Sequence, residues 1–171
     1  MKARQGAIVA IVEGKRASES VTEMVQVVLP NDANPLGFIL GGTVMHLIDI
    51  AGAIACARHN RTRMVTAAVD DLQFLHPIKV GDLILLNARV TCVFKTSLEV
   101  QVDVHSEESL TGKRLLTSRA FLTFVAVAEN GSRLPVTPLV VDTDEEKRVC
   151  EQAHARRAAR LKRRDENALL P

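Results

Sequence analysis

The residue with the clearest chemical potential is a carboxylate inside the most apolar stretch of the sequence. Residues 43–57 are apolar or small at almost every position, on every side of a helical wheel, and Asp49 lies in their middle. An ionised carboxylate in such surroundings costs several kcal/mol unless it is hydrogen-bonded or becomes protonated. Asp49 therefore fits a general base in a pocket. The alternative is a structural carboxylate that pairs with His46, one turn back, or accepts backbone N–H bonds from a neighbouring strand.

Two glycines stand at the start of the same predicted helix. Gly41 and Gly42 leave backbone N–H groups open to a ligand, and these groups stabilise an oxyanion together with the positive end of the helix dipole. Gly41 precedes Asp49 by about two helical turns. This spacing predicts that the donor and the acid flank one reacting carbonyl. A plain tight turn into the helix is the commoner use of two glycines.

Three further polar residues have both a structural and a chemical interpretation. Asn34 precedes Pro35, and it is either a turn asparagine or an amide that orients water or a carbonyl. Thr66 opens a predicted strand, a position that β-propensity alone would explain. His59 stands near the end of the predicted helix, where the dipole favours an imidazolium.

The elements that must position these residues follow from hydrophobic periodicity. The helix is expected over residues 43–59. Strands are expected at residues 21–30, 66–77, 80–94, 97–105 and 113–128. Short connections between the last four strands favour an antiparallel sheet. Residues 142–167 change from acidic to basic, an order that suits the dipole of a solvated C-terminal helix with a frayed end at 167–171.

The pattern of apolar faces predicts how the helix and the strands pack. Residues 97–105 alternate between apolar and polar side chains, as a half-buried strand does. The second half of residues 113–128 is apolar on both faces, which predicts a contact beyond the helix. A helix that is apolar on all sides must be enclosed. One sheet encloses it only by curling around it while a partner closes the rest, so the sequence predicts an α+β homo-oligomer.

Composition limits the functional classes. The chain has 171 residues, which suggests one domain, and 47% of them are hydrophobic and 25% charged. Aromatic residues make up 3%, so stacking platforms for single-stranded nucleic acid are essentially absent. The net charge of +2 is too small to indicate nucleic acid as a partner. We expect neither a signal peptide, because the apolar segment at 7–12 is short, nor a span of ~20 apolar residues for a membrane.

The three cysteines Cys56, Cys92 and Cys150 are odd in number and widely spaced. They form no metal-ligand pair and no obvious disulfide framework, so a reducing cytoplasm is the expected compartment. The sequence has no G-x-S-x-G, Walker A or G-x-G-x-x-G motif. An α/β serine hydrolase and a nucleotide cofactor are therefore not expected.

Three stretches in the same order resemble the hotdog-fold acyl-CoA thioesterases, and most closely their cytosolic acyl-CoA hydrolase branch. They are DANPLGFILGGTVMHLIDIAGA, VTAAVDDLQFLHPIKVGDLI and RAFLTFVAVAENGSRLPVTP. The resemblance covers about residues 21–138. It implies a central hydrophobic helix wrapped by a curved, antiparallel, five-stranded sheet. It also implies a dimer with active sites at its interface, and often a hexamer built from three dimers.

The resemblance also implies roles for particular residues. Asp49 matches the catalytic carboxylate, Gly41 the oxyanion donor, and Thr66 a threonine near the attacking water. Asn34 matches an asparagine supplied across the interface by the other subunit. Residues that match contacts to the coenzyme A part of the substrate are Gly42, Lys95, Thr96 and Ser97. No metal and no organic cofactor is implied.

The expected function is hydrolysis of an acyl-CoA thioester to a free acid and CoA, with Asp49 acting as general base or nucleophile. A non-catalytic acyl-CoA binding module and an enoyl-thioester hydratase or dehydratase remain as alternatives. The expected organisation is a lead-in at 1–20, a thioesterase domain at 21–140 and a helical tail at 141–171. An acidic partner for the basic tail is a further alternative to a simply solvated helix.

Overall fold

The computed structural model describes residues 13–167. The apolar segment at 7–12, most of the predicted lead-in at 1–20, and residues 168–171 of the predicted frayed end lie outside the described residues. The helices and strands are β1 (Lys15–Arg16), β2 (Thr22–Val27), α1 (Gly41–Asn60), β3 (Met64–Phe74), β4 (Leu83–Val93), β5 (Ser97–Glu107), β6 (Arg114–Ala126), β7 (Leu139–Val140) and α2 (Asp144–Asn167). The predicted α+β class is confirmed.

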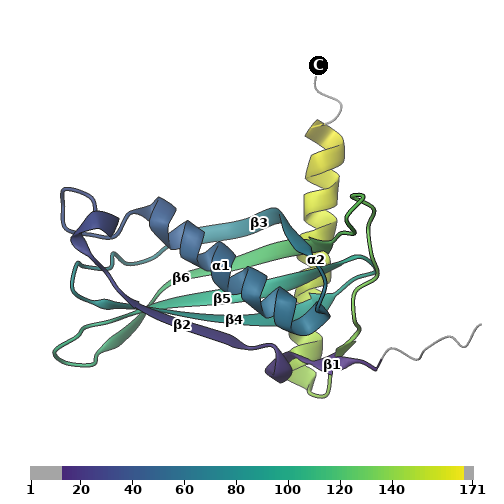
Figure 1. Cartoon of the computed structure of the whole chain (residues 1–171), viewed down its shortest axis with the longest axis horizontal. Helices are drawn as coiled ribbons and strands as arrows, with labels where there is room; N and C mark the ends of the chain where they lie inside the picture. The colour runs from purple at the N-terminus through teal and green to yellow at the C-terminus, as the bar shows by residue number, and fades with distance from the viewer. Residues whose placement is uncertain (1–12, 168–171) are drawn as a thin grey trace, which may run out of the picture.

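A five-stranded antiparallel sheet in the order β2-β4-β5-β6-β3 forms the main layer. Figure 1 shows α1 lying along one face of this sheet, while α2 crosses the strands on the opposite face. The five strands match the predicted runs. The short parallel pair of β1 and β7 was not predicted, because two residues are too few to carry a periodicity. Division of the chain at residues 20 and 140 stays a prediction.

The core lies between α1 and the inner face of the sheet. Val44, Ile48, Ala51 and Ala55 of α1 are buried there against alternate residues of the central strands. The buried strand residues are Ile84, Leu86, Ala88 and Val90 of β4, Leu98, Val100, Val102 and Val104 of β5, and Ala120, Leu122, Phe124 and Ala126 of β6. Burial of this apolar surface contributes about 25 cal/mol per Å². It holds α1 firmly in place along the sheet.

One glycine of α1 permits the close approach of helix and sheet. A Cβ atom at Gly52 would lie 3.0 Å from the ring of Phe124, closer than side chains normally pack. α1 starts at Gly41, two residues earlier than predicted, and it ends with Arg61 in the left-handed conformation at φ 53°. These bounds place Gly41 at the first helical position.

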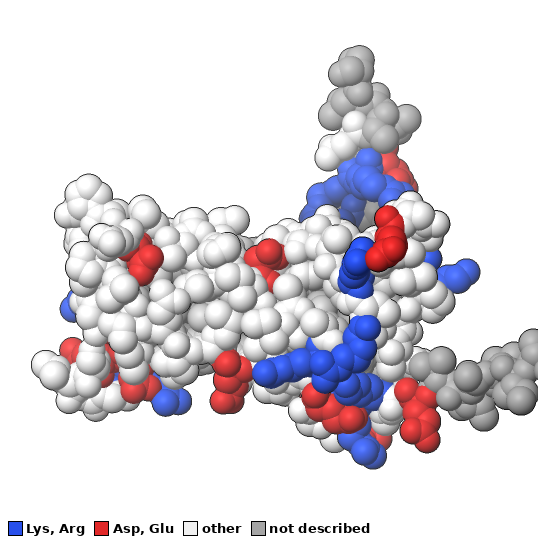
Figure 2. All heavy atoms as spheres, in the orientation of Figure 1, with Lys and Arg blue, Asp and Glu red and all other residues white. Residues whose placement is uncertain are grey.

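α1 is not enclosed on all sides within one chain. Met45 is 48% exposed and His46 is exposed, on the side of the helix that faces away from the sheet. Figure 2 shows few Lys, Arg, Asp and Glu side chains on the left and in the centre of this face, whereas charged side chains gather at its right. The expected enclosure of the apolar helix therefore requires a second chain.

The edge strand β3 is a second uncovered apolar surface. β3 pairs with β6 on one side and lies at the edge of the sheet on the other. Val65 and Val69 are 47% and 48% exposed along it. A long apolar edge with free backbone groups favours pairing with another chain. Because β3 also lies beside α1, one partner chain could cover both surfaces.

The predicted solvated C-terminal helix is wrong in one respect, because one side of α2 packs on the outer face of the sheet. Ala153 is fully buried there. Arg156 donates two hydrogen bonds to Glu99, of 2.8 and 3.0 Å, and its guanidinium lies 3.7 Å from the ring centroid of Phe121. Arg160 pairs with the buried Asp70. The packing buries polar residues, so hydropathy alone did not reveal it.

This docking also corrects the prediction for residues 97–105. Their polar face is not uniformly solvated, because Glu99, paired with Arg156 of α2, is 1% exposed and Gln101 is 5% exposed. The Glu99 carboxylate is paired with the guanidinium of Arg156, and it also accepts a hydrogen bond of 2.7 Å from the Thr91 hydroxyl. A buried carboxylate with these partners avoids the cost of an unpaired charge. β5 is thus buried on both faces over its first half.

The expectation of no disulfide framework is also corrected. Cys92 and Cys150 are joined by a disulfide that links β4 to α2, and Cys56 is a free, buried cysteine. The two bonded residues are 58 positions apart in the sequence. Their spacing therefore gave no sign of the pairing.

Among residues 13–167, no helix is both long and apolar enough to cross a membrane.

His59 is buried and does not act as a charged C-terminal residue of α1. It is 2% exposed, and its Nε2 lies 3.0 Å from the carbonyl oxygen of Thr137. Burial lowers the pKa of the His59 imidazole, which the contact with Thr137 offsets in part. The prediction of an imidazolium favoured by the helix dipole is therefore wrong, because desolvation outweighs the dipole.

The lowered pKa of His59 predicts a loss of stability in mild acid. The unfolded chain binds the proton at the ordinary value of about 6.5, whereas the folded chain resists it, so protonation favours unfolding as pH falls below that value. The urea midpoint should fall between about pH 7.5 and about pH 5.5. It should fall less in His59→Gln, which keeps a donor for Thr137 but does not titrate. Equal falls in His59→Gln and in the exposed-site control His46→Gln would contradict the assignment.

Candidate active site

Asp49 is held by a strand residue rather than by a histidine. Thr66 of β3 donates a hydrogen bond of 2.6 Å from its hydroxyl to Oδ1 of Asp49. Among residues 13–167, Asp49 takes part in no ion pair and makes no hydrogen bond to His46. A hydrogen bond from a hydroxyl group to a carboxylate is short and strong. It fixes the Asp49 side chain and leaves its second oxygen available to a substrate or water.

The local structure of β3 explains the position of Thr66. Thr66 pairs with Phe124 of β6, and the register shifts between Thr66 and Ala68. Such a bulge bends the strand and re-aims the side chains near it. Phe124 faces α1, so its pairing partner Thr66 lies on the side of the sheet that carries the helix. Thr66 is exposed and Asp49 is half-buried, so the pair is accessible at the open edge of β3.

Cys56 lies on the same side of α1 as Asp49 but is not a candidate nucleophile. Burial raises the pKa of its thiol, and the negative charge of Asp49 raises it further. The reactive form of cysteine is the thiolate. A thiol kept protonated in this way does not attack a carbonyl, so Asp49 is the candidate reactive group on this part of the helix.

The start of α1 presents a free backbone donor. Leu40, the residue before the helix, is extended with φ −67° and ψ 135°, and its side chain makes no capping bond. The first N–H groups of a helix have no partner inside the helix. A Cβ atom added at Gly42 would meet nothing within 4 Å, whereas one at Gly41 would lie 3.5 Å from the ring of Phe74. The N–H of Gly41 is therefore a donor in an open, partly apolar setting.

Asn34 adopts the turn that its sequence position suggested. Its Oδ1 accepts hydrogen bonds from the backbone N–H groups of Leu36, at 2.9 Å, and Phe38, at 3.3 Å. None of the hydrogen bonds described for residues 13–167 uses its Nδ2. The turn holds the amide rigidly, and its NH₂ group remains available to a ligand or to a second chain.

A groove of about 360 Å³ connects Asn34 with the start of α1. Its walls are mainly apolar. The lining residues are Asn34, Phe38, Ile39, Gly41, Val44, Phe74, Leu75, His76, Pro77, Ile78 and Ser118. Sequence reasoning missed Phe74, which lies against Gly41, because no short-range pattern connects the end of β3 to the start of α1. The groove has the size and apolar character of a small-molecule site.

Asp49 does not line this groove. Gly41 and Asp49 are about 12 Å apart along the axis of α1, at about 1.5 Å per residue. The expectation that both flank one reacting carbonyl is therefore wrong for a single chain. The structure brings Asp49 together with Thr66, and Gly41 together with Asn34, but it separates the two pairs.

Lys95, Thr96 and Ser97 form a third group at the other end of α1. Lys95 and Thr96 lie in the turn between β4 and β5, and Ser97 is the first residue of β5; a hydrogen bond of 2.7 Å from the N–H of Phe94 to the carbonyl of Ser97 closes the turn. The carbonyl of Thr96 accepts a hydrogen bond of 3.0 Å from Ala126. Lys95 is exposed. The turn is rigid in its backbone, with the Lys95 ammonium group free to meet an anion.

The central helix and the antiparallel sheet form the hotdog fold of thioesterases, and comparison with known proteins agrees. A family model described as the thioesterase superfamily matches residues 36–113. The chain is 40% identical over 134 residues to the uncharacterized acyl-CoA thioester hydrolase YkhA of Bacillus subtilis, covering 78% of each protein. The chain belongs to this superfamily, among its acyl-CoA thioester hydrolases.

Other relatives extend this comparison. The cytosolic acyl coenzyme A thioester hydrolase of Homo sapiens is 35% identical over 91% of this chain, which spans 42% of the human protein. The crystal structure of an apo-hexameric acyl-CoA thioesterase has a TM-score of 0.85 and 41% identity, over 94% of this chain and 100% of the other. The acyl-CoA hydrolase of Staphylococcus aureus, solved with butyryl coenzyme A, coenzyme A and coenzyme A disulfide, has a TM-score of 0.83 and 33% identity, over 91% and 95% of the two chains.

Proposed function

We propose that this chain hydrolyses acyl-CoA thioesters to a carboxylic acid and CoA, in active sites shared between two copies of the chain. The observation that carries the proposal is the Asp49 carboxylate, fixed by Thr66 at the open edge of β3 and free of any ion pair among the described residues. A carboxylate held in this way is suited to activate water or to attack a carbonyl.

Variants of a relative support the choice of residues. Structures of the Staphylococcus aureus acyl-CoA hydrolase have been solved with alanine in place of an asparagine, an aspartate or a threonine. These three residues are separated along that enzyme by the same numbers of residues as Asn34, Asp49 and Thr66 in this chain. The agreement supports a common role for the three positions.

The reaction follows from the chemistry of these groups. Asp49 takes a proton from a water molecule, whose oxygen adds to the thioester carbonyl. The N–H of Gly41 donates to the developing oxyanion, an interaction worth roughly 3–4 kcal/mol in the transition state. The tetrahedral intermediate then expels the CoA thiolate, which takes up the proton. Direct attack by Asp49, followed by hydrolysis of the anhydride, uses the same groups.

The separation of Asp49 from Gly41 is the reason for proposing a shared site. A symmetric dimer that pairs the β3 edges would bring the Asp49–Thr66 pair of one subunit to Asn34 and Gly41 of the partner subunit. The same contact would cover the exposed apolar side of α1. Because related thioesterases are hexameric, we further propose that three such dimers associate.

The CoA part of the substrate is assigned to Gly42, Lys95, Thr96 and Ser97. Lys95 is placed to meet a phosphate, and the hydroxyls of Thr96 and Ser97 to hydrogen-bond to the nucleotide or pantetheine part. The apolar groove beside Phe38 and Phe74 suits the acyl or pantetheine chain. The reaction needs no metal and no organic cofactor. The cytosolic human relative supports a cytoplasmic location.

Replacement of Asp49 tests the central assignment. Asp49→Asn keeps an acceptor for the Thr66 hydroxyl and the size of the side chain, so folding and oligomeric state should be unchanged. Release of free thiol from acyl-CoA should fall by a factor of about 10² or more, the usual contribution of a general base. Size-exclusion chromatography provides the control for assembly. Full turnover by a correctly assembled variant would disprove the role of Asp49.

A proline at position 41 tests the backbone donor alone. Proline is favoured at the first helical position, and Leu40 already has the extended conformation that a following proline requires. Gly41→Pro should therefore fold but lose its N–H, and kcat should fall by about 10²–10³. Gly41→Ala keeps the N–H and is the matched control. Equal kcat values for the two variants would rule out Gly41 as the oxyanion donor.

Mixing two inactive variants tests the shared site. Chains with Asp49→Asn and chains with Asn34→Ala should each be inactive alone. Co-expressed in equal amounts, they should regain roughly a quarter of the wild-type activity, because half of the dimers are mixed and each mixed dimer has one intact site. Activity that stays at the level of the single variants would show that each site is built from one chain.

Tight CoA binding without thiol release from wild-type protein would favour the non-catalytic binding module instead.

A further inference from the structure

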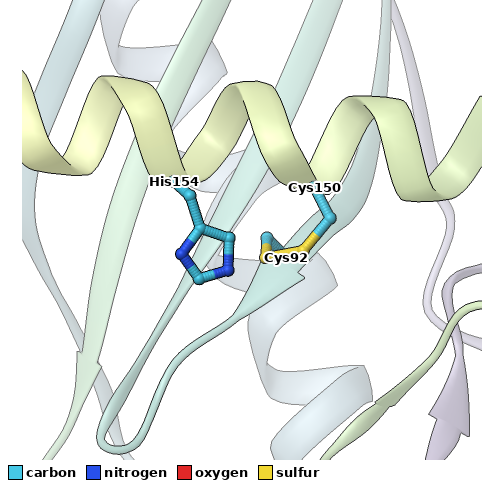
Figure 3. Close-up of side chains that lie close together, drawn as sticks. All are labelled: Cys92, Cys150 and His154. Carbon is cyan, nitrogen blue, oxygen red and sulfur yellow. A yellow bond between two sulfur atoms is a disulfide. The ribbon is translucent and has the colours of Figure 1, made fainter.

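A cluster of two cysteines and a histidine lies on the outer face of the sheet, opposite the face that carries α1 and Asp49. Cys92 stands near the end of β4, while Cys150 and His154 are one turn apart on α2 (Figure 3). The two sulfur atoms and a ring nitrogen of His154 lie within 4.8 Å of one another. Figure 3 shows the imidazole directed toward the disulfide. The cluster therefore combines a redox-active bond with a group that transfers protons.

A bulge explains why Cys92 faces α2. The pairing of β4 with β5 shifts between Val90 and Cys92, so that Cys92 lies opposite Glu99. Glu99 belongs to the outer face, where it pairs with Arg156 of α2. Without the bulge, strict alternation would turn Cys92 toward α1, like Val90. The Cα atoms of Cys92 and Cys150 are 4.8 Å apart, within the usual range for a disulfide.

The two cysteine residues differ in exposure. Cys92 is 1% exposed, Cys150 is half-buried and His154 is exposed. Because Cys150 is the more exposed residue, we take its sulfur as the point of attack for a small thiolate. Its attack forms a mixed disulfide at Cys150 and releases Cys92 as a thiolate, which takes up a proton from solvent, with the His154 ring beside it as a relay. A second thiolate then attacks the mixed disulfide, releasing the Cys150 thiol and a small-molecule disulfide.

The cluster contacts the turn that we assign to CoA. Phe94 follows Cys92 by two residues and directly precedes Lys95. Its ring packs edge-on against His154, with 5.1 Å between ring centroids, and the guanidinium of Arg157 lies 5.0 Å from its centroid. The middle of α2 therefore packs against this turn through His154 and Arg157.

Two ion pairs of α2 limit which part of the helix can become mobile when the disulfide is reduced. Arg156 stays paired with Glu99, and Arg160 stays paired with Asp70. Loss of the disulfide would therefore loosen residues 144–154 and the turn at 94–97, while the middle of α2 keeps its place on the sheet. We therefore expect reduction of the disulfide to change the order of these two segments only.

We propose that Cys92, Cys150 and His154 form a thiol–disulfide exchange site for small thiols, which sets the order of the turn at residues 94–97 and thereby the affinity for CoA. The effect on CoA rests on the proposed function, whereas the exchange chemistry does not. In the reductive direction two small thiols are oxidised to one disulfide, and the protein disulfide is reduced to two thiols. Glutathione and CoA, the thiol product of the proposed reaction, are the two sources to compare.

The exchange chemistry is tested on the full chain without any assay of activity. Protein with Cys56→Ala, which leaves Cys92 and Cys150 as its cysteines, is equilibrated with graded ratios of reduced and oxidised glutathione, and in parallel with CoA and its disulfide. Alkylation and mass spectrometry should find two thiols per chain replaced by one disulfide. His154→Gln should slow the exchange without preventing the disulfide. A chain that stays reduced at every ratio, or that binds one Zn²⁺ per reduced chain in place of forming the disulfide, overturns the proposal.

Hydrogen exchange and substrate kinetics test the coupling to the turn. Reduction should speed amide exchange at residues 94–97 and 144–154 but not around Arg156. It should raise KM for acyl-CoA by about fivefold, the low end of usual coupling energies, with kcat unchanged. Cys150→Ser should behave as the reduced protein in every buffer. Identical exchange and KM in both redox states overturn the coupling. Disulfide formation and altered amide exchange in a chain that does not cleave acyl-CoA would refute the proposed function alone.

Discussion

The structure depends on the burial of one apolar helix against one sheet. α1 packs on the inner face of the sheet closely enough that Gly52 has no room for a side chain beside Phe124. This contact fixes the height and rotation of α1, and so it fixes where Asp49 and Gly41 point. The sheet covers only one side of the helix, however. The exposed apolar side of α1 connects the fold to assembly, because the surface that a second chain must cover also carries Asp49, the proposed catalytic carboxylate.

The same constraint explains why the polar groups form separate pairs. A straight helix carries Gly41 and Asp49 at different heights, and no rearrangement of side chains brings them together. Asn34 is fixed by its own turn, and Thr66 by the pairing of β3 with β6. Each group is rigid where it stands. Two-fold symmetry is the simplest way to combine rigid, separated halves into one site, and it needs no movement of the backbone.

The sequence predicted the elements well, because strands and a helix with strong periodicity dominate this chain. It also indicated Asp49, whose charge is exceptional among its neighbours. It failed where burial involves polar residues. Glu99 is buried by an arginine from α2, Cys92 is turned outward by a bulge, and His59 is neutral because it is desolvated. It also could not show that Gly41 and Asp49 are too far apart, because that distance depends on the helix running straight between them.

α2 joins three different strands from behind the sheet. It is linked to β4 through Cys150, to β5 through Arg156 and to β3 through Arg160. A helix attached at three such points resists sliding of the strands past one another, and sliding is the motion that would flatten a twisted sheet. The curvature of the β3 edge is therefore maintained from the face opposite the active site. In the proposed dimer a second chain would meet an edge of fixed shape, so the fit between subunits would depend on a helix on the opposite face of the sheet.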